Sequence, residues 1–165
     1  MKKLLTLTLT LALALTLACC GWSPMYKSEN NLQGRTRYIY IAPISGTNGI
    51  DLRNALKAKF GTDNEADAKY ILNVDLAAPY TVYKAIQLTG DATWQEVRLV
   101  ANYKLLDAKS NDVIVTGHDT ASESYTFVRD LVAAQASYNN AIQSSIRVLS
   151  EKIETRVNAK LANSD

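Results

Sequence analysis

Two adjacent cysteines, Cys19 and Cys20, carry the only thiols of the 165-residue chain. A disulfide between neighbours would join Cα atoms about 3.8 Å apart, below the roughly 4.4 Å that ordinary disulfides need. A structural metal site needs about four ligands, and the chain has a single histidine to add to the pair. Covalent modification of one sulfur is therefore the chemistry that this pair suggests.

The residues before the cysteines have the pattern of an export signal. Met1-Lys2-Lys3 is basic, and residues 4–18 consist only of Leu, Ala and Thr, which is the layout of a secretory signal peptide. A retained membrane anchor is the alternative. However, a helix of this length extends about 22 Å, which is short of a hydrocarbon core of about 30 Å. We therefore predict a signal peptide over residues 1–19.

The junction Leu17-Ala18-Cys19-Cys20 resembles the lipobox of bacterial lipoproteins, in which the last cysteine is lipidated on sulfur and becomes the new N-terminus. We expect lipidation at Cys20. Cys19 is the alternative, but choosing it would put Thr16 where the pattern prefers leucine. With Cys20 acylated and Cys19 removed, the mature chain has no free thiol, which suits an oxidising envelope compartment.

Cleavage after residue 19 also changes the charge of the protein. The full chain has 18 Lys and Arg against 16 Asp and Glu, and the signal peptide removes Lys2 and Lys3 and no acidic residue. The mature chain is therefore neutral, with 16 residues of each sign. A neutral chain offers no bulk electrostatic attraction to nucleic acid.

Motifs for catalysis or cofactor binding are missing from the sequence. His118 is followed by Asp119, but adjacent positions of a strand point to opposite faces, so we interpret His118 as an ordinary strand residue. There is no Gly-x-Ser-x-Gly elbow, no P-loop and no Gly-x-Gly-x-x-Gly. We predict that the protein is not an enzyme and holds no metal and no cofactor.

Hydrophobic periodicity predicts the elements of one domain. Residues 38–41, 70–76, 80–88, 97–105 and 113–125 have strand character, and Asp107 to Asp112 reads as the turn of an antiparallel hairpin. Ile50 to Phe60 has helical spacing and is followed by Gly61. A long helix is indicated by an apolar stripe with about 3.75 residues per step, which is unlike a heptad coiled coil; the stripe comprises Leu131, Ala134, Tyr138, Ile142, Ile146, Leu149, Ile153, Val157 and Leu161.

These elements predict an α+β two-layer sandwich. We expect a mostly antiparallel sheet of about four strands, covered by one short helix and one long C-terminal helix. The strand over residues 97–105 has the clearest alternation and predicts one buried and one wet face. Tyrosines such as Tyr40, Tyr70 and Tyr103 fit core or interface positions. The domain organisation that follows is a signal peptide (1–19), a lipidated N-terminus with a polar tether (20–37) and a single domain (38–165).

Cys20-Gly21-Trp22-Ser23-Pro24-Met25-Tyr26 resembles the start of lipopolysaccharide-assembly lipoproteins of the LptE family, especially the alphaproteobacterial branch. The helix around 52–56, the strands at 70–74 and 97–107, Gly117 with Ser124-Tyr125, and the long C-terminal helix are similar to that family as well. The resemblance implies a lipoprotein of the outer membrane that sits as a plug inside the LptD β-barrel. It would assist assembly of the barrel, bind lipopolysaccharide and help to insert it into the outer leaflet.

Two further expectations complete the interpretation. Gly21 after the modified cysteine agrees with sorting to the outer membrane. Arg98 and Lys104 share the wet face of the clearest strand, where their charges could meet lipopolysaccharide phosphates, although a solvated face or a contact with the barrel wall is the alternative. Other functions that suit a lipidated α+β domain are an auxiliary lipoprotein of an ABC-type lipid transport system and a chaperone or pilot for another barrel or secretion pore.

Overall fold

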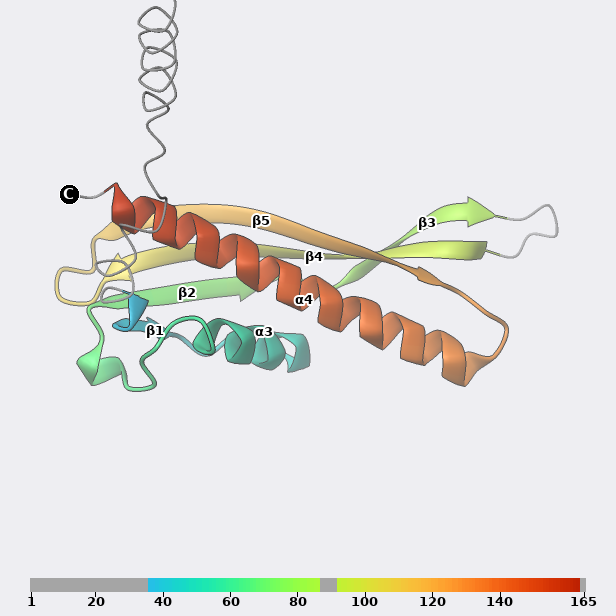
Figure 1. Ribbon diagram of the computed structural model, residues 1–165, viewed down its shortest axis with the longest axis horizontal. Coiled ribbons are helices and arrows are strands. Elements are labelled where there is room, and N and C mark those ends of the chain that lie inside the picture. Colours follow the sequence, from blue (N-terminus) through green and yellow to red (C-terminus); the bar gives the residue numbers. More distant parts are fainter. Residues whose placement is uncertain (1–35, 87–91, 164–165) are drawn as a thin grey trace, which may run out of the picture. The chain divides into compact units, whose positions relative to one another are not determined.

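The computed structural model describes residues 36–86 and 92–163. The predicted signal peptide, Cys19, Cys20, all but two residues of the predicted tether and the last two residues of the strand predicted over 80–88 lie outside the described residues. The described residues form one compact unit. Its sheet and helices make an α+β two-layer sandwich, as predicted (Figure 1).

The sheet has five strands rather than about four. They are β1 (Ile39–Ile41), β2 (Tyr70–Leu76), β3 (Tyr80–Ile86), β4 (Ala92–Asp107) and β5 (Val113–Thr126). Strand β1, which the sequence predicted over residues 38–41, pairs in parallel with β2, and the other strand pairs are antiparallel. The sheet is therefore mixed, with one parallel pair at one border.

Strand β4 organises the sheet because it is 16 residues long and pairs with three others. Strand β5 occupies one edge of β4 over residues 94–106. On the other edge, β3 pairs with residues 92–98 and β2 with residues 101–107. Alternation explains the two faces: the odd-numbered residues of β4 from Gln95 to Leu105 are buried, and the even-numbered ones face away from the core.

Two α-helices cover the buried face of the sheet (Figure 1). Helix α3 (Thr47–Lys57) presents Leu52 and Leu56, and α4 (Leu131–Ala162) presents the predicted stripe. Both belong to one cluster with the sheet, so the domain has a single core. No helix among the described residues is both long and apolar enough to cross a membrane.

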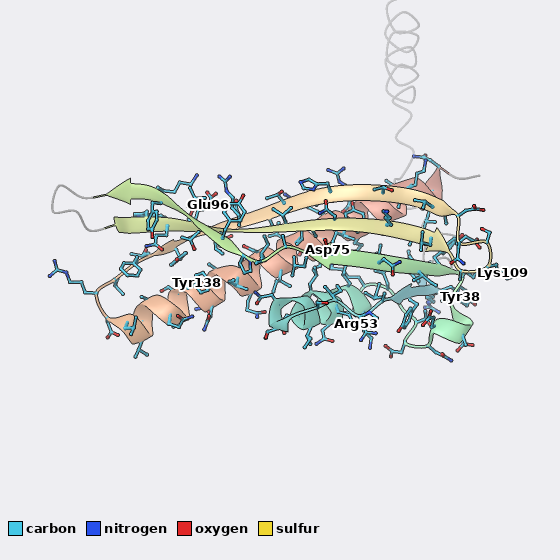
Figure 2. The ribbon with its side chains drawn as sticks, turned by 180° about the vertical axis from the view of Figure 1, so that it is seen from behind. Tyr38, Arg53, Asp75, Glu96, Lys109 and Tyr138 are labelled. Carbon is cyan, nitrogen blue, oxygen red and sulfur yellow. The ribbon has the colours of Figure 1, made fainter. Side chains whose placement is uncertain are left out.

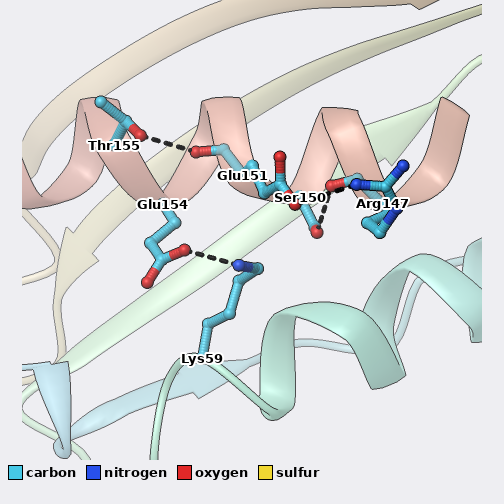
Figure 3. Close-up of polar contacts among 6 residues, drawn as sticks. All are labelled: Lys59, Arg147, Ser150, Glu151, Glu154 and Thr155. Carbon is cyan, nitrogen blue, oxygen red and sulfur yellow. Dashed lines mark hydrogen bonds and ion pairs between the residues drawn. The ribbon is translucent and has the colours of Figure 1, made fainter. Parts of the chain in front are cut away.

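Polar contacts fasten the two helices to each other. Lys59, just after α3, lies 2.7 Å from a carboxylate oxygen of Glu154 on α4 (Figure 3). Nearer the start of α3, the amide of Gln143 donates to Asp51 at 2.8 Å. These contacts join residues more than 90 positions apart in the sequence.

Several details differ from the prediction, among them the end of α3, which lies at Lys57 rather than Phe60. Helix α3 begins at Thr47 rather than Ile50, and β4 begins at Ala92 rather than Val97. The side chain of Leu131 was predicted to begin the buried stripe, but it is 78% exposed. Burial on α4 starts at Ala134, because the first residues of the helix lie beyond the contact with the sheet.

Candidate functional site

The open face of the sheet, opposite the helices, carries both charged residues that the sequence marked. Arg98 and Lys104 occupy even-numbered positions of β4, whose odd-numbered neighbours are buried. Figure 2 views the strands from the side opposite to α4 and labels Glu96 and Asp75 on them. The predicted placement of the two residues on one wet face is confirmed.

Arg98 is held by neighbours on β3 and β4. Its Nε lies 2.5 Å from Oε1 of Glu96, while Nζ of Lys84 lies 3.0 Å from the other oxygen. Hydrogen bonds from Arg98 and then Lys84 lower the pKa of Glu96, and the bond to Glu96, followed by one to Tyr80, raises the pKa of Arg98. The charge of Arg98 is therefore partly balanced within the protein.

Lys104 lies in a shallow hollow of about 580 Å³ on the same face. Two rows of directly opposed side chains line it: Asn73, Lys104 and Thr116 form one row, and Asp75, Asn102 and His118 the other. Nδ1 of His118 lies 2.7 Å from Oδ1 of Asn102. Among the described residues Lys104 makes no ion pair with a carboxylate, so this ammonium group is better placed than Arg98 to meet an external anion.

His118 and Asp119 point to opposite faces, as expected for neighbours in a strand. His118 is exposed on the open face, whereas Asp119 is only 4% exposed beneath the helix layer. The hydroxyl of Tyr103 donates to Oδ2 of Asp119 at 2.8 Å, and Nε of Arg156 on α4 lies 3.0 Å from Oδ1. Asp119 thus joins the sheet to α4, a role that the sequence did not reveal.

Gly117 makes room for this arrangement. A Cβ atom built at Gly117 would lie 2.1 Å from Cζ of Tyr103, far inside contact distance. The Tyr103 side chain is 2% exposed, and burial, followed by the hydrogen bond to Asp119, raises the pKa of its hydroxyl. The hydroxyl therefore stays protonated and serves as a donor in the core.

Three exposed aromatic side chains lie on β3 and β4, where the sequence analysis predicted no function. Tyr80, Tyr83 and Trp94 are 47%, 65% and 51% exposed. Tyr80 and Tyr83 are three positions apart on β3 and therefore point to opposite faces of the sheet, so their spacing in the sequence did not predict their exposure. Within the described ranges no group of three or more His, Cys, Asp or Glu could hold a metal ion.

Solved structures with the same fold include several bacterial lipoproteins. A protein from Caulobacter crescentus CB15 described as a lipoprotein gives a TM-score of 0.68 at 20% identity, covering 82% of this chain and 98% of that one. A minor lipoprotein from Acinetobacter baumannii gives 0.57 at 17%, covering 76% and 93%. The rare lipoprotein B from Shewanella oneidensis gives 0.57 at 10%, covering 76% and 96%. A comparison with curated sequences found no match.

The sheet, with a helical layer on one face and an open second face, places the domain in the α+β two-layer sandwich class. Its likeness to the solved lipoproteins concerns the fold. The family model for LptE, described as lipopolysaccharide assembly, matches residues 36–157. The chain therefore belongs to the LptE lipopolysaccharide-assembly family, as the sequence resemblance predicted.

Proposed function

We propose that the mature protein is an outer-membrane lipoprotein that forms a plug-type complex with an LptD β-barrel, supports assembly of the barrel and helps to insert lipopolysaccharide into the outer leaflet. The observation that carries this proposal is the family match over residues 36–157. The proposal assigns no catalysis and no cofactor, in keeping with a role in assembly.

The surface of the domain suits this role. A lumen of an outer-membrane barrel is polar, so a plug inside it needs polar rather than apolar outer faces. The open face offers amides, hydroxyls and balanced charges. Because the mature chain is neutral, it has no large net charge that charged groups of the barrel lumen would repel or hold.

The proposed anchor is an acylated Cys20 at the start of the mature chain, with Cys19 as the alternative. Residues 1–19 would be removed, residues 20–37 would form the lipidated N-terminus and tether, and residues 38–165 the domain. Stable anchoring needs more than one acyl chain, which a lipoprotein cysteine provides. The intact mass of the mature N-terminal peptide identifies the modified cysteine, and an unmodified residue 20 would contradict the assignment.

Affinity purification from detergent-solubilised outer membranes tests the proposed partner. We expect a large barrel of the LptD type to co-purify. Recovery of an ABC permease would instead favour an auxiliary lipoprotein of lipid transport, and recovery of a secretin without that barrel would favour a pilot. The family match makes the barrel the expected outcome.

Arg98 and Lys104 are the proposed contacts for lipopolysaccharide phosphates. Because Glu96 already binds Arg98, we expect Lys104→Ala to weaken lipopolysaccharide binding more than Arg98→Ala. Lys109→Ala, on the exposed turn after β4, is the matched control. Binding by the folded variants can be measured by titration with purified lipopolysaccharide. Unchanged binding in both variants would show that the open face meets solvent or the barrel wall instead.

A further inference from the structure

The outer edge of β5 is a second surface of the sheet. Among the described residues β5 pairs only with β4, so the other edge of this 14-residue strand faces no neighbouring strand (Figure 1). An unpaired edge presents main-chain N–H and C=O groups that can accept another strand.

Hydrogen bonds at β4 decide which β5 residues point outward. The carbonyl of Val100 accepts a hydrogen bond from the backbone N–H of Ala77 on the β2 side. The main-chain N–H and C=O groups of the even-numbered β4 residues therefore point away from β5. Odd-numbered residues of β4 therefore bond to β5, and the register opposes them to odd-numbered residues of β5. The even-numbered residues of β5 carry the outward N–H and C=O groups. They include Thr116, His118, Thr120, Ser122 and Ser124.

One contact confirms this direction. Nζ of Lys152 on α4 donates to the carbonyl of Thr120 at 2.7 Å, which requires that carbonyl to point out of the sheet. The rest of the edge lacks the residues that usually protect one, because β5 contains no proline, lysine or arginine. Its outward positions carry hydroxyls and one imidazole, which are compatible with strand pairing.

Two hollows lie along the contact between the β5 edge and helix α4, which we call the α4 seam. One hollow, of about 450 Å³, is lined by Asp119 of β5 and by α4 residues that include Val148, Lys152 and Arg156. A second, of about 370 Å³, lies further along the same seam, between residues 123–126 of β5 and residues 137–144 of α4. An added strand would place alternate side chains over this seam, since side chains alternate between the two faces.

We infer that the β5 edge and the α4 seam together form a strand-addition site for an extended segment of a partner protein that presents an acidic side chain to Lys152. The main-chain groups supply affinity and the hollows supply selectivity, as in other β-augmentation sites. A carboxylate is favoured because, among the described residues, Lys152 binds a carbonyl oxygen and no carboxylate, whereas Arg156 already binds Asp119. The inference holds whichever protein supplies the strand, so its test does not use the barrel.

The probe is an acetylated nine-residue peptide that alternates Thr and Val around a central Glu. Binding to the full mature chain in detergent is followed by amide hydrogen exchange in ¹⁵N NMR spectra. We expect exchange at His118, Thr120 and Ser122 to slow by about tenfold or more, because these amides gain partners. The same peptide N-methylated on every amide should produce no slowing, because neither of its edges then carries an N–H donor for the β5 carbonyls. A central Lys in place of Glu should weaken binding by about two- to fivefold.

A pair of variants separates backbone from side-chain effects. Ser122→Pro removes an outward N–H but no bond to β4, and proline is tolerated on edge strands. It should abolish peptide binding, whereas Ser122→Ala should bind as the unmodified chain does. Equal binding by Ser122→Pro and Ser122→Ala, or slowing by the N-methylated peptide, would overturn the inference. So would a β5-mediated dimer in light scattering, because a second copy would then be the occupant. If Ser122→Pro does not fold, the comparison of the peptide with its N-methylated form still tests whether main-chain hydrogen bonds hold the peptide at the β5 edge.

Discussion

Single residues in the core show how closely the sheet is fitted to α4. Gly117 leaves space for the ring of Tyr103, Tyr103 donates to Asp119, and Asp119 receives Arg156 from the helix. A buried carboxylate is tolerable only when its oxygens are satisfied. The position of each of these side chains therefore depends on its neighbour, so a substitution at Gly117 would also disturb the contact between the sheet and α4.

Gly117→Ala should destabilise the protein by about 1–3 kcal/mol, because overpacking a filled core forces side chains away from their preferred positions. The added carbon would lie 2.1 Å from Cζ of Tyr103, so the ring has to move. Urea unfolding measures the loss. Thr116→Ala, at the exposed neighbouring position, should change stability by less than about 0.5 kcal/mol. Equal stability of both variants would show that the ring has room to shift freely.

Acidification should weaken the Lys84, Glu96 and Arg98 cluster. The pKa of Glu96 is lowered in the folded state by hydrogen bonds from Arg98 and Lys84. Its contribution to stability is therefore complete above the ordinary value of 4.5 and is lost as pH falls through the lower folded value. A carbon-detected NMR titration should give a midpoint below 4.5, and Glu96→Gln should make stability less pH-dependent in this range. A midpoint at or above 4.5 would contradict the hydrogen-bonded arrangement.

At the scale of elements, α4 was the most predictable part of the chain and the start of β4 the least. Eight of the nine stripe residues pack against the core, because a long helix repeats its pattern many times. In the first part of β4, the apolar residue is exposed and the polar one is buried: Trp94 is 51% exposed and Gln95 is 7% exposed. The side-chain oxygen of Gln95 accepts a hydrogen bond from the hydroxyl of Tyr125 at 2.5 Å. Alternation of apolar residues therefore could not reveal that β4 begins at Ala92.

The start of α4 depends on its cap. The side chain of Asp130 accepts from the backbone N–H of Val132 at 2.9 Å and of Ala133 at 3.2 Å. Asp130→Ala should cost about 1 kcal/mol, since two N–H groups of the first turn lose their partner. Asp130→Asn keeps an acceptor and should retain most of the stability. Thermal unfolding followed by circular dichroism compares the two, and an equal loss in both would assign the effect to charge rather than to capping.

For the molecule as a whole, the sequence predicted the two layers, the open face and the positions of Arg98 and Lys104 on it. The contacts that distinguish these two residues could not be predicted, because Lys84 reaches Glu96 through a β3–β4 register that includes irregularities. The outward edge of β5 was also hidden. The free edge of β5 results from the order of the strands in the sheet, with β2 and β3 on one side of β4 and β5 on the other. The local pattern of apolar and polar residues does not determine that order.

A single core predicts a single unfolding transition. Leu149 is fully buried in the cluster that unites the sheet, α3 and α4. Leu149→Ala should destabilise the protein by about 2–5 kcal/mol through lost burial and a residual cavity. Circular dichroism and tyrosine fluorescence should shift together in denaturant titrations. Separate transitions would mean that the helical layer and the sheet unfold independently.

The contact between Lys59 and Glu154 also has a consequence for synthesis. Synthesis proceeds from the N-terminus, so Leu52 and Leu56 of α3 emerge long before the α4 residues that complete the same core. Pairings so distant in sequence form slowly, and the exposed apolar surface in the interval favours aggregation. A nascent chain of this protein therefore passes through an interval, ended only when α4 (Leu131–Ala162) has been made, in which a holding chaperone would protect it.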